Sequence, residues 1–204
     1  MNLRTKVICG LLAIVTGAIA AQAQPGINNN YPAMWNMVWE ASTLKKTYSA
    51  TTALAVPASS ATDVCSLSGS ATRVVRVRRI IFTSTPTTAV SEPIAILKRS
   101  TAYTAGAGAA LTKVPYDSQY GASTVGMAEV WTGNPTVGTI VGALAEVSFH
   151  FGVSTTAPSI PAVFTFGQLG SAAVLRGVAQ NVAINLNGTT FTGTFSCTFE
   201  WTEE

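Results

Sequence analysis

The side chains that could do chemistry are few and scattered. The 204 residues include three cysteines, one histidine and nine acidic residues. A Ser-His-Asp set needs an aspartate that orients the histidine, but Asp63 and Asp117 lie in no recognisable nucleophile context. The single histidine, His150, alternates with Glu146 and Ser148, which predicts a solvent-facing or edge position. The sequence therefore does not indicate a catalytic triad.

Other catalytic or ligand-binding patterns are also weak. Paired carboxylates for glycoside hydrolysis could come from four residues, but no spacing selects a pair among Glu92, Asp117, Glu129 and Glu146. The cysteines and the histidine lack the spacing of metal ligands. Gly106-Ala107-Gly108 has no strand-to-helix context for phosphate binding. We expect no enzyme activity, no metal and no cofactor.

Two cysteines sit in predicted strands. Cys65 alternates with Leu67, and Cys197 alternates with Phe195 and Phe199, so each cysteine belongs to an apolar face. In an exported protein such a pair favours a disulfide, which would stabilise the fold by ~4–5 kcal/mol in the chain-entropy model. The alternative is two small buried hydrophobic residues on separate strands. Both interpretations remain open from the sequence.

One cluster of basic residues comprises Arg73, Arg76, Arg78 and Arg79. In a regular strand Arg76 and Arg78 share a face, whereas Arg79 points with Val75 and Val77. The simpler interpretation is a solvated face plus one edge or interface arginine. The alternative is a patch for an anionic partner such as an acidic polysaccharide, made of Arg73, Arg76 and Arg78 and extended by Lys98 if its strand pairs with theirs as a hairpin. Nucleic acid is not expected, because no aromatic residues interleave with the basic ones.

The N-terminus predicts export. Arg4 and Lys6 precede the apolar run Val7–Ala21, and Ala21-Gln22-Ala23 follows as a small-x-small cleavage site. Residues 1–23 therefore read as a signal peptide, because the run is shorter than the ~20 residues that cross a bilayer; an uncleaved anchor is the alternative. Without them the chain has 10 Lys and Arg against 9 Asp and Glu, a net charge of +1. We expect a secreted, periplasmic or cell-surface protein without general attraction to nucleic acid or membrane.

The segment 24–46 is rich in large apolar side chains, namely Met34, Trp35, Met37 and Trp39. One interpretation is a lid or short helix that packs over an end of the domain. The other is an N-terminal arm that docks on a neighbouring subunit, since Trp and Met are enriched in interface cores. Left exposed, the segment would promote aggregation.

Residues 47–204 predict one β-rich domain. Turn-forming clusters separate nine strand-like segments: 47–56, 63–68, 73–83, 93–99, 128–131, 138–151, 162–166, 172–186 and 189–202. No long 3.6-residue apolar period lies between them, which argues against a parallel sheet with crossover helices. The expected fold is an antiparallel β-sandwich, with a jelly roll as first topology and an immunoglobulin-like sandwich as the alternative.

The last thirty residues predict a β-hairpin. Val182, Ile184 and Leu186 alternate with polar or small residues, and a second alternating segment follows Asn187-Gly188. Asn-Gly is the preferred pair for a type I′ hairpin turn. With this turn the apolar faces of both strands coincide, and Ile184 lies opposite Phe191.

Six further segments are informative: 47–54, 74–81, 97–101, 114–118, 175–177 and 200–204. They resemble a group of uncharacterised proteins encoded by bacteriophages and by prophage-like regions of bacterial genomes. The resemblance implies a small β-sandwich component of a virion or surface, of the decoration or fibre type, that works as a homo-oligomer. It implies no functional residues.

The expected function is that of a non-enzymatic exported structural subunit that self-assembles on a cell surface or virion. Its expected partners are copies of itself and cell-surface or virion proteins. The alternative is a secreted carbohydrate-binding module, which would present aromatic rings to a glycan; the candidates are Tyr103, Tyr116, Tyr120 and Trp131.

Overall fold

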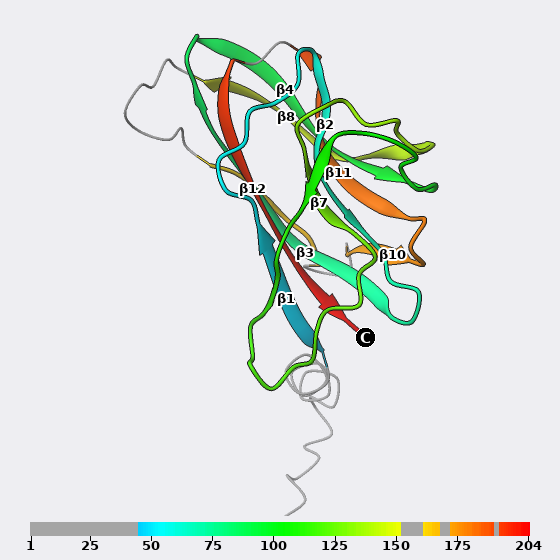
Figure 1. Cartoon of the computed structure of the whole chain (residues 1–204). Coiled ribbons are helices and arrows are strands. Elements are labelled where there is room, and N and C mark those ends of the chain that lie inside the picture. The colour runs from blue at the N-terminus through cyan, green and yellow to red at the C-terminus, as the bar shows by residue number, and fades with distance from the viewer. Residues whose placement is uncertain (1–44, 152–160, 168–171, 190–191) are drawn as a thin grey trace, which may run out of the picture. The chain divides into compact units, whose positions relative to one another are not determined.

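Strands and turns make up the chain wherever its structure is described. The computed structural model describes residues 45–151, 161–167, 172–189 and 192–204, and no helix occurs among them (Figure 1). The strands are β1 Lys46–Thr51, β2 Ala61–Ser68, β3 Val74–Pro86, β4 Val90–Arg99, β5 Gly108–Ala110, β6 Lys113–Pro115, β7 Ala128–Trp131, β8 Ile140–Phe151, β9 Ala162–Thr165, β10 Ala173–Arg176, β11 Asn181–Thr189 and β12 Gly193–Glu203.

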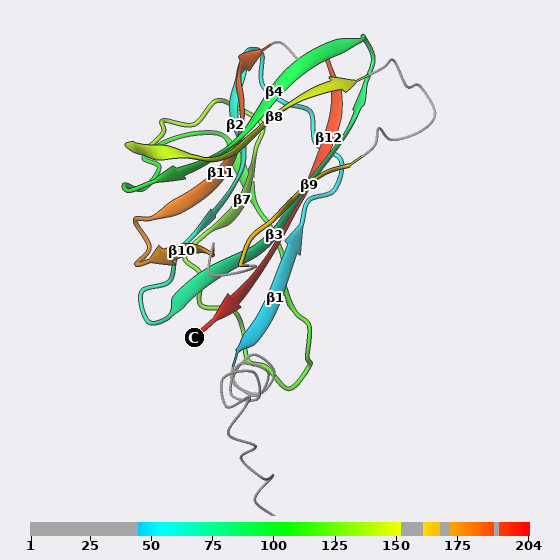
Figure 2. The same ribbon diagram turned by 180° about the vertical axis from the view of Figure 1, so that it is seen from behind.

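The strands form two antiparallel sheets that pack face to face (Figures 1 and 2). Sheet A has the order β10-β3-β12-β1-β6, and β9 also pairs with β3. Sheet B has the order β5-β7-β2-β11-β4-β8. The predicted antiparallel β-sandwich is confirmed.

The pairing of the strands is nested. β1 pairs with β12, β2 with β11, β3 with β10 and β9, and β4 with β8, so the first half of the chain pairs with the second half in reverse order. Successive strands β1 to β4 alternate between the sheets. This is a jelly roll, the first of the two topologies expected. An immunoglobulin-like sandwich would place strands in the orders A-B-E-D and C-F-G instead.

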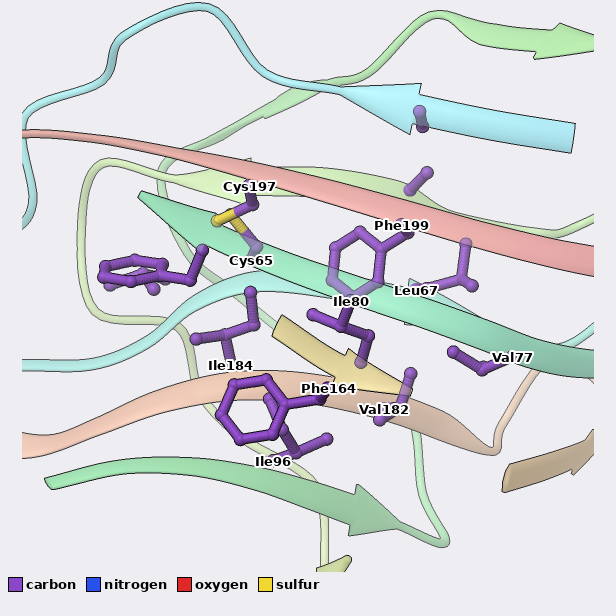
Figure 3. Packing of buried hydrophobic residues seen from close by; sticks show 14 of the residues in the cluster. Cys65, Leu67, Val77, Ile80, Ile96, Phe164, Val182, Ile184, Cys197 and Phe199 are labelled. Carbon is purple, nitrogen blue, oxygen red and sulfur yellow. A yellow bond between two sulfur atoms is a disulfide. The ribbon is translucent and has the colours of Figure 1, made fainter. Parts of the chain in front are cut away.

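Alternating residues of both sheets meet in one core. Trp201, Phe199 and Phe195 of β12 are fully buried. Figure 3 shows Phe199 in the same core as Leu67, Ile184 and Ile96 of sheet B. Burial of each such side chain stabilises the fold by roughly 1.5–3 kcal/mol. The alternation is that of an amphipathic strand, which explains why the strand-like segments were recognisable in the sequence.

The predicted C-terminal hairpin is wrong. β11 lies in sheet B and β12 lies in sheet A, so the two strands do not pair. Their apolar faces do coincide, but across the core rather than side by side. Asn187 and Gly188 have positive φ of 53° and 78°, and Thr189 then pairs with Ala61 of β2, so this dipeptide bends a continuing strand.

The predicted strand 172–186 is also two strands. β10 belongs to sheet A and β11 to sheet B, and Gly177 with φ of 79° lies in the turn between them. Positive φ costs glycine nothing, which allows the chain to reverse there. Val178, predicted to lie within that strand, lies in the turn and is exposed.

Candidate functional site

Cys65 and Cys197 form a disulfide, the first of the two interpretations left open by the sequence. The bond joins β2 of sheet B to β12 of sheet A through the core (Figure 3). Both cysteines are completely buried. The disulfide is therefore a structural link between the sheets and not an exposed reactive group.

The four residues of the expected basic patch have different environments in the structure. Arg76 donates to Glu204 at 2.7 Å, and Lys98 of sheet B donates from Nζ to the Val174 carbonyl oxygen of β10 at 2.9 Å. The predicted hairpin between the strands of Arg78 and Lys98 does not form, because β3 and β4 lie in different sheets. Arg73 precedes β3, and Arg78 is exposed on it.

A β-bulge changes the predicted orientation of Arg79. Glu200 lies opposite Arg79 and Trp201 lies opposite Val77, so Arg78 is an extra residue in β3. The bulge reverses the alternation, and Arg79 is exposed on the outer face of sheet A instead of pointing with Val77. Its Nη2 donates to Glu200 Oε1 at 2.5 Å. The assignment of Arg79 to the Val75 and Val77 face is therefore wrong.

The most buried ion pair joins Asp63 of β2 to Arg99 of β4. Arg99 donates from Nε and Nη2 to the two carboxylate oxygens at 2.8 and 2.9 Å. Tyr103 and Asn185 donate to the same carboxylate at 2.6 and 2.5 Å. Each oxygen thus accepts two hydrogen bonds, which saturates the carboxylate. Burial and the neighbouring Asp63 raise the pKa of Tyr103. This cluster is structural, because no acceptor site is left for a ligand.

A second buried carboxylate, Glu203, is held by neutral donors. Ser123 Oγ, Thr124 Oγ1 and the Thr124 N–H donate to it at 2.5, 2.7 and 3.1 Å, and Trp201 Nε1 donates at 3.1 Å. Burial by itself raises the pKa of Glu203, but these hydrogen bonds outweigh it and lower the pKa. Glu203 therefore ties the loop before β7 to the C-terminal strand.

The four aromatic candidates for glycan binding differ in exposure. Trp131 is buried and donates from Nε1 to Ser66 Oγ, and its ring packs against Tyr103. Tyr120 is half-buried against the ring of Tyr48. Tyr116 has an exposed fraction of 61%. Among these four, Tyr116 is the only ring that presents an open surface.

The carboxylates considered for glycoside hydrolysis lie on separate elements. Asp117 lies in the turn after β6, where it accepts a hydrogen bond from the Gln119 N–H. Glu129 is on β7 and Glu146 is on β8, at nearly opposite ends of sheet B. The described residues contain no group of three His, Cys, Asp or Glu that could hold a metal ion. Glu92 and His150 belong to β4 and β8, but their side chains lie outside the described part of the structure.

The edge strands of the sandwich differ sharply in length. β5 and β6 have three residues each, and β9 and β10 have four. β8 has twelve residues and forms the last strand of sheet B. Long apolar edges attract further strands, so proteins usually shorten them or add lysine or proline. β8 contains neither of these residues, and Glu146 is its only acidic residue.

The exposed backbone groups of β8 can be assigned from its pairing with β4. Ser148 lies opposite Pro93, whose carbonyl oxygen accepts a hydrogen bond from Asn187 of β11 and so points away from β8. In an antiparallel ladder the N–H and C=O of Ser148 then point away from β4 as well. Alternation gives the same outward direction to the backbone groups of Glu146 and His150. No other strand of the described residues pairs with this side of β8, so these groups are available as donors and acceptors at the edge.

Two irregularities divide β8. Register shifts between Ile96 and Leu97 and between Lys98 and Arg99 leave Leu144 and Val141 without partners in β4. Val141 and Leu144 have exposed fractions of 62% and 39%. The C-terminal part, 145–151, pairs with β4 residue by residue. Seven residues of regular edge are therefore available next to exposed apolar side chains.

An apolar groove lies between β8 and the edge of sheet A. It has a cavity volume of about 590 Å³ and is lined mainly by apolar residues: Leu144, Ala145, Val163, Phe164, Thr165, Phe166, Ala172 and Ala173. Phe164 reaches from β9 into the core beside Ile96 (Figure 3). The groove is open to solvent, and it meets β8 at Leu144 and Ala145, where the regular edge begins. We call the 145–151 edge and this groove together the β8 edge site.

Sequence reasoning recognised the strand of the β8 edge site but not its position. Low charge over 138–151 was the available signal, and a strand of this composition could equally lie in the middle of a sheet. The residues of the expected arm, Met34, Trp35, Met37 and Trp39, lie outside the described residues, as does the expected signal peptide. No helix in the described part of the chain has the length and apolar character to span a bilayer.

Comparisons of the chain with protein-family models, with curated proteins and with solved structures found no match. The geometry of the β8 edge site and of the buried clusters is therefore the basis for assigning a function. Among the described residues, the β8 edge site combines outward backbone groups without a strand partner and exposed apolar surface.

Proposed function

We propose that the protein is an exported, non-enzymatic structural subunit that assembles with copies of itself on a cell surface or virion. The observation that carries the proposal is the β8 edge site. It combines a regular, unpaired strand edge with an apolar groove, and edges of this kind pair with other chains. A subunit whose role is assembly has a use for such an edge, whereas a monomer would be at risk of aggregation.

Two features support export. The disulfide between Cys65 and Cys197 is of a kind that persists in oxidising compartments and is rare in the cytosol. The N-terminal sequence has the charge, length and cleavage site of a signal peptide. Both are compatible with a destination at the cell surface or, for a phage-encoded protein, in the virion.

The surroundings of the carboxylates support a non-enzymatic role. Asp63 is saturated by hydrogen bonds, and Glu203 is buried with neutral donors. Asp117, Glu129 and Glu146 lie in a turn, on β7 and on β8, and this dispersed arrangement favours a non-enzymatic role over that of a glycosidase, which needs two neighbouring carboxylates.

A secreted carbohydrate-binding module is the second candidate, and Tyr116 favours it. The ring is largely exposed, and it lies beside the Arg79–Glu200 ion pair. An exposed ring next to hydrogen-bonding charges suits a sugar, which stacks one face and hydrogen-bonds its hydroxyls. Glycan-array binding that disappears in a Tyr116→Ala variant would support this candidate.

The proposed assembly is tested on the whole chain expressed with its N-terminal segment and purified after export. N-terminal sequencing is expected to find Gln24 as the first residue. Light scattering coupled to size-exclusion chromatography is expected to give a multiple of the single-chain mass or a polymer. A single-chain mass at every concentration, with no association with cell surfaces or virions, would overturn the proposal.

A further inference from the structure

We propose that the β8 edge site of one subunit accepts the N-terminal arm of a second copy as an added strand. Residues 33–39 would pair with the 145–151 edge and place Trp35, Met37 and Trp39 in the groove. The inference rests on the proposed function, because it names the contact through which the subunits assemble.

The acceptor edge has the length and backbone groups that strand addition needs. Its seven residues pair regularly with β4, so no bulge interrupts the outer side of the strand. The N–H and C=O groups of Glu146, Ser148 and His150 point outward, as the pairing of Ser148 with Pro93 indicates. An extended peptide added to such an edge gains affinity from main-chain hydrogen bonds and specificity from pockets for alternate side chains.

The groove favours an occupant with apolar side chains at alternate positions. In an extended segment, Trp35, Met37 and Trp39 point to the same side, because strand side chains alternate. The segment 33–39 contains no charged residue and no proline. Its seven residues equal the length of the regular edge. Large apolar side chains are also what the lining of Leu144, Phe164 and Phe166 can contact.

The position of β1 favours a second copy over the same chain. The arm joins the sandwich at the start of β1, which lies in sheet A between β12 and β6. β8 lies at the opposite side, where it contacts β3. Figures 1 and 2 also show the start of β1 at the lower end of the sandwich and β8 in its upper part. Donor and acceptor on different surfaces make a head-to-tail contact, which extends into a filament or closes into a ring.

A cross-linking experiment tests the contact directly. A photoreactive phenylalanine analogue replaces Ser148 in the whole chain, and ¹⁴N-labelled and ¹⁵N-labelled subunits are mixed before assembly. After irradiation, mass spectrometry is expected to find position 148 of one isotope joined to residues 33–39 of the other. Cross-links confined to one isotope would show that the arm folds back on its own subunit and would overturn the inference.

Two variants of the acceptor test the same contact through assembly. Ser148→Pro removes an outward N–H without removing a bond to β4, and Leu144→Lys places a charge at the groove. Each is expected to raise the concentration needed for assembly at least tenfold. The matched control is Val114→Lys, an exposed valine on β6 at the far edge of sheet A, which is expected to assemble normally.

Thermal unfolding of each variant shows whether the fold is intact, so that loss of assembly is interpreted only in folded protein. Normal assembly of both folded acceptor variants would overturn the inference and leave the proposed function standing. A whole chain that stays monomeric would contradict both.

Discussion

Asp63 and Arg99 form an ion pair in the protein interior, where each side chain compensates the charge of the other. Their side chains have exposed fractions of 0% and 2%, in contrast to 45% for Arg79 in its pair with Glu200. Removing one member of a buried pair leaves an uncompensated charge, which costs more than the pair itself contributes.

We expect Arg99→Met to lower the free energy of unfolding by ~3–5 kcal/mol, because the buried Asp63 carboxyl group is then left without its main partner. Urea unfolding followed by circular dichroism measures the change. Arg79→Met is the control and should have a far smaller effect, because solvent screens its pair with Glu200. Equal losses in the two variants would contradict the assigned role of the buried pair.

Glu203 makes stability depend on pH. The pKa of Glu203 is lower in the folded protein than the value of about 4.3 in an unfolded chain. A lowered folded pKa stabilises the protein above the unfolded pKa, and this contribution is lost as the pH falls through the folded pKa.

We expect Glu203→Gln to reduce the free energy of unfolding at pH 7 by ~1–3 kcal/mol, because the amide cannot accept from all four donors. The difference from the unchanged protein should shrink as the pH falls from the unfolded-chain value of about 4.3 through the lower folded pKa of Glu203, where this carboxylate becomes protonated. Unfolding curves between pH 7 and pH 3 measure it, with exposed Glu146→Gln as control. A difference that stays constant over this range would refute the assignment.

At the residue scale, neither cluster was recognisable in the sequence. Asp63 and Arg99 lie on different strands, and register shifts in β2/β11 and β4/β8 determine which face each occupies. A single extra residue reverses the alternation of side chains, as Arg78 does for Arg79. The alternation of apolar residues therefore predicts which face of a sheet a side chain occupies only up to the next β-bulge.

At the scale of elements, the Asn187-Gly188 dipeptide shows that local conformation and strand pairing are determined by different interactions. Both residues adopt the positive φ that their types favour. The hairpin nevertheless does not form, because β12 buries its apolar face from the opposite sheet. The local sequence thus predicted a bend at these two residues correctly, but the predicted pairing of β11 with β12 was wrong.

We expect Gly188→Ala to lower the free energy of unfolding by ~1–2 kcal/mol, because its φ of 78° strains any residue with a Cβ atom. A Cβ atom would meet no other atom there, so the cost comes from the backbone alone. Gly142→Ala is the matched control: its Cβ would also meet nothing, and its φ is ordinary. Gly142→Ala should be neutral or stabilising by ~0.5–1 kcal/mol. Chemical unfolding of both variants compares them, and the reverse order would contradict this account.

At the scale of the whole molecule, the disulfide links the sheets over a sequence separation of 132 residues. Loss of a native disulfide from a small exported domain typically costs ~2–5 kcal/mol. Loss of the disulfide is expected to destabilise both sheets, because β2 and β12 belong to different sheets.

We expect the double variant Cys65→Ala, Cys197→Ala to lose ~2–5 kcal/mol of unfolding free energy. The unchanged protein should lose a comparable amount in reducing agent, whereas the double variant should not respond to the reductant. Thermal and urea unfolding with and without reductant measure both effects. A reductant effect on the double variant would show that the loss has another source.

The architecture was predictable because its alternating apolar segments and turn residues are local signals. The antiparallel class and the sandwich follow from them, whereas the nine expected segments fall short of the twelve observed strands. Which strand reaches an edge depends on pairings between distant segments, and these leave no local mark. The β8 edge site was missed for this reason, although its strand was predicted within two residues of its observed start.

The nested order of strands also sets when folding can begin. None of β1 to β4 pairs with another of these four; β1 pairs with β6 and β12, and β3 pairs with β9, β10 and β12. A chain that emerges from a membrane pore N-terminus first therefore has no native sheet to build from its first hundred residues. Pairing can begin once β6, β7 and β8 follow, because they pair with β1, β2 and β4. These contacts join distant parts of the chain, and non-local contacts make folding slow. β12, the last strand along the chain, lies between β1 and β3 in sheet A, so this sheet cannot be completed before the C-terminal residues are available.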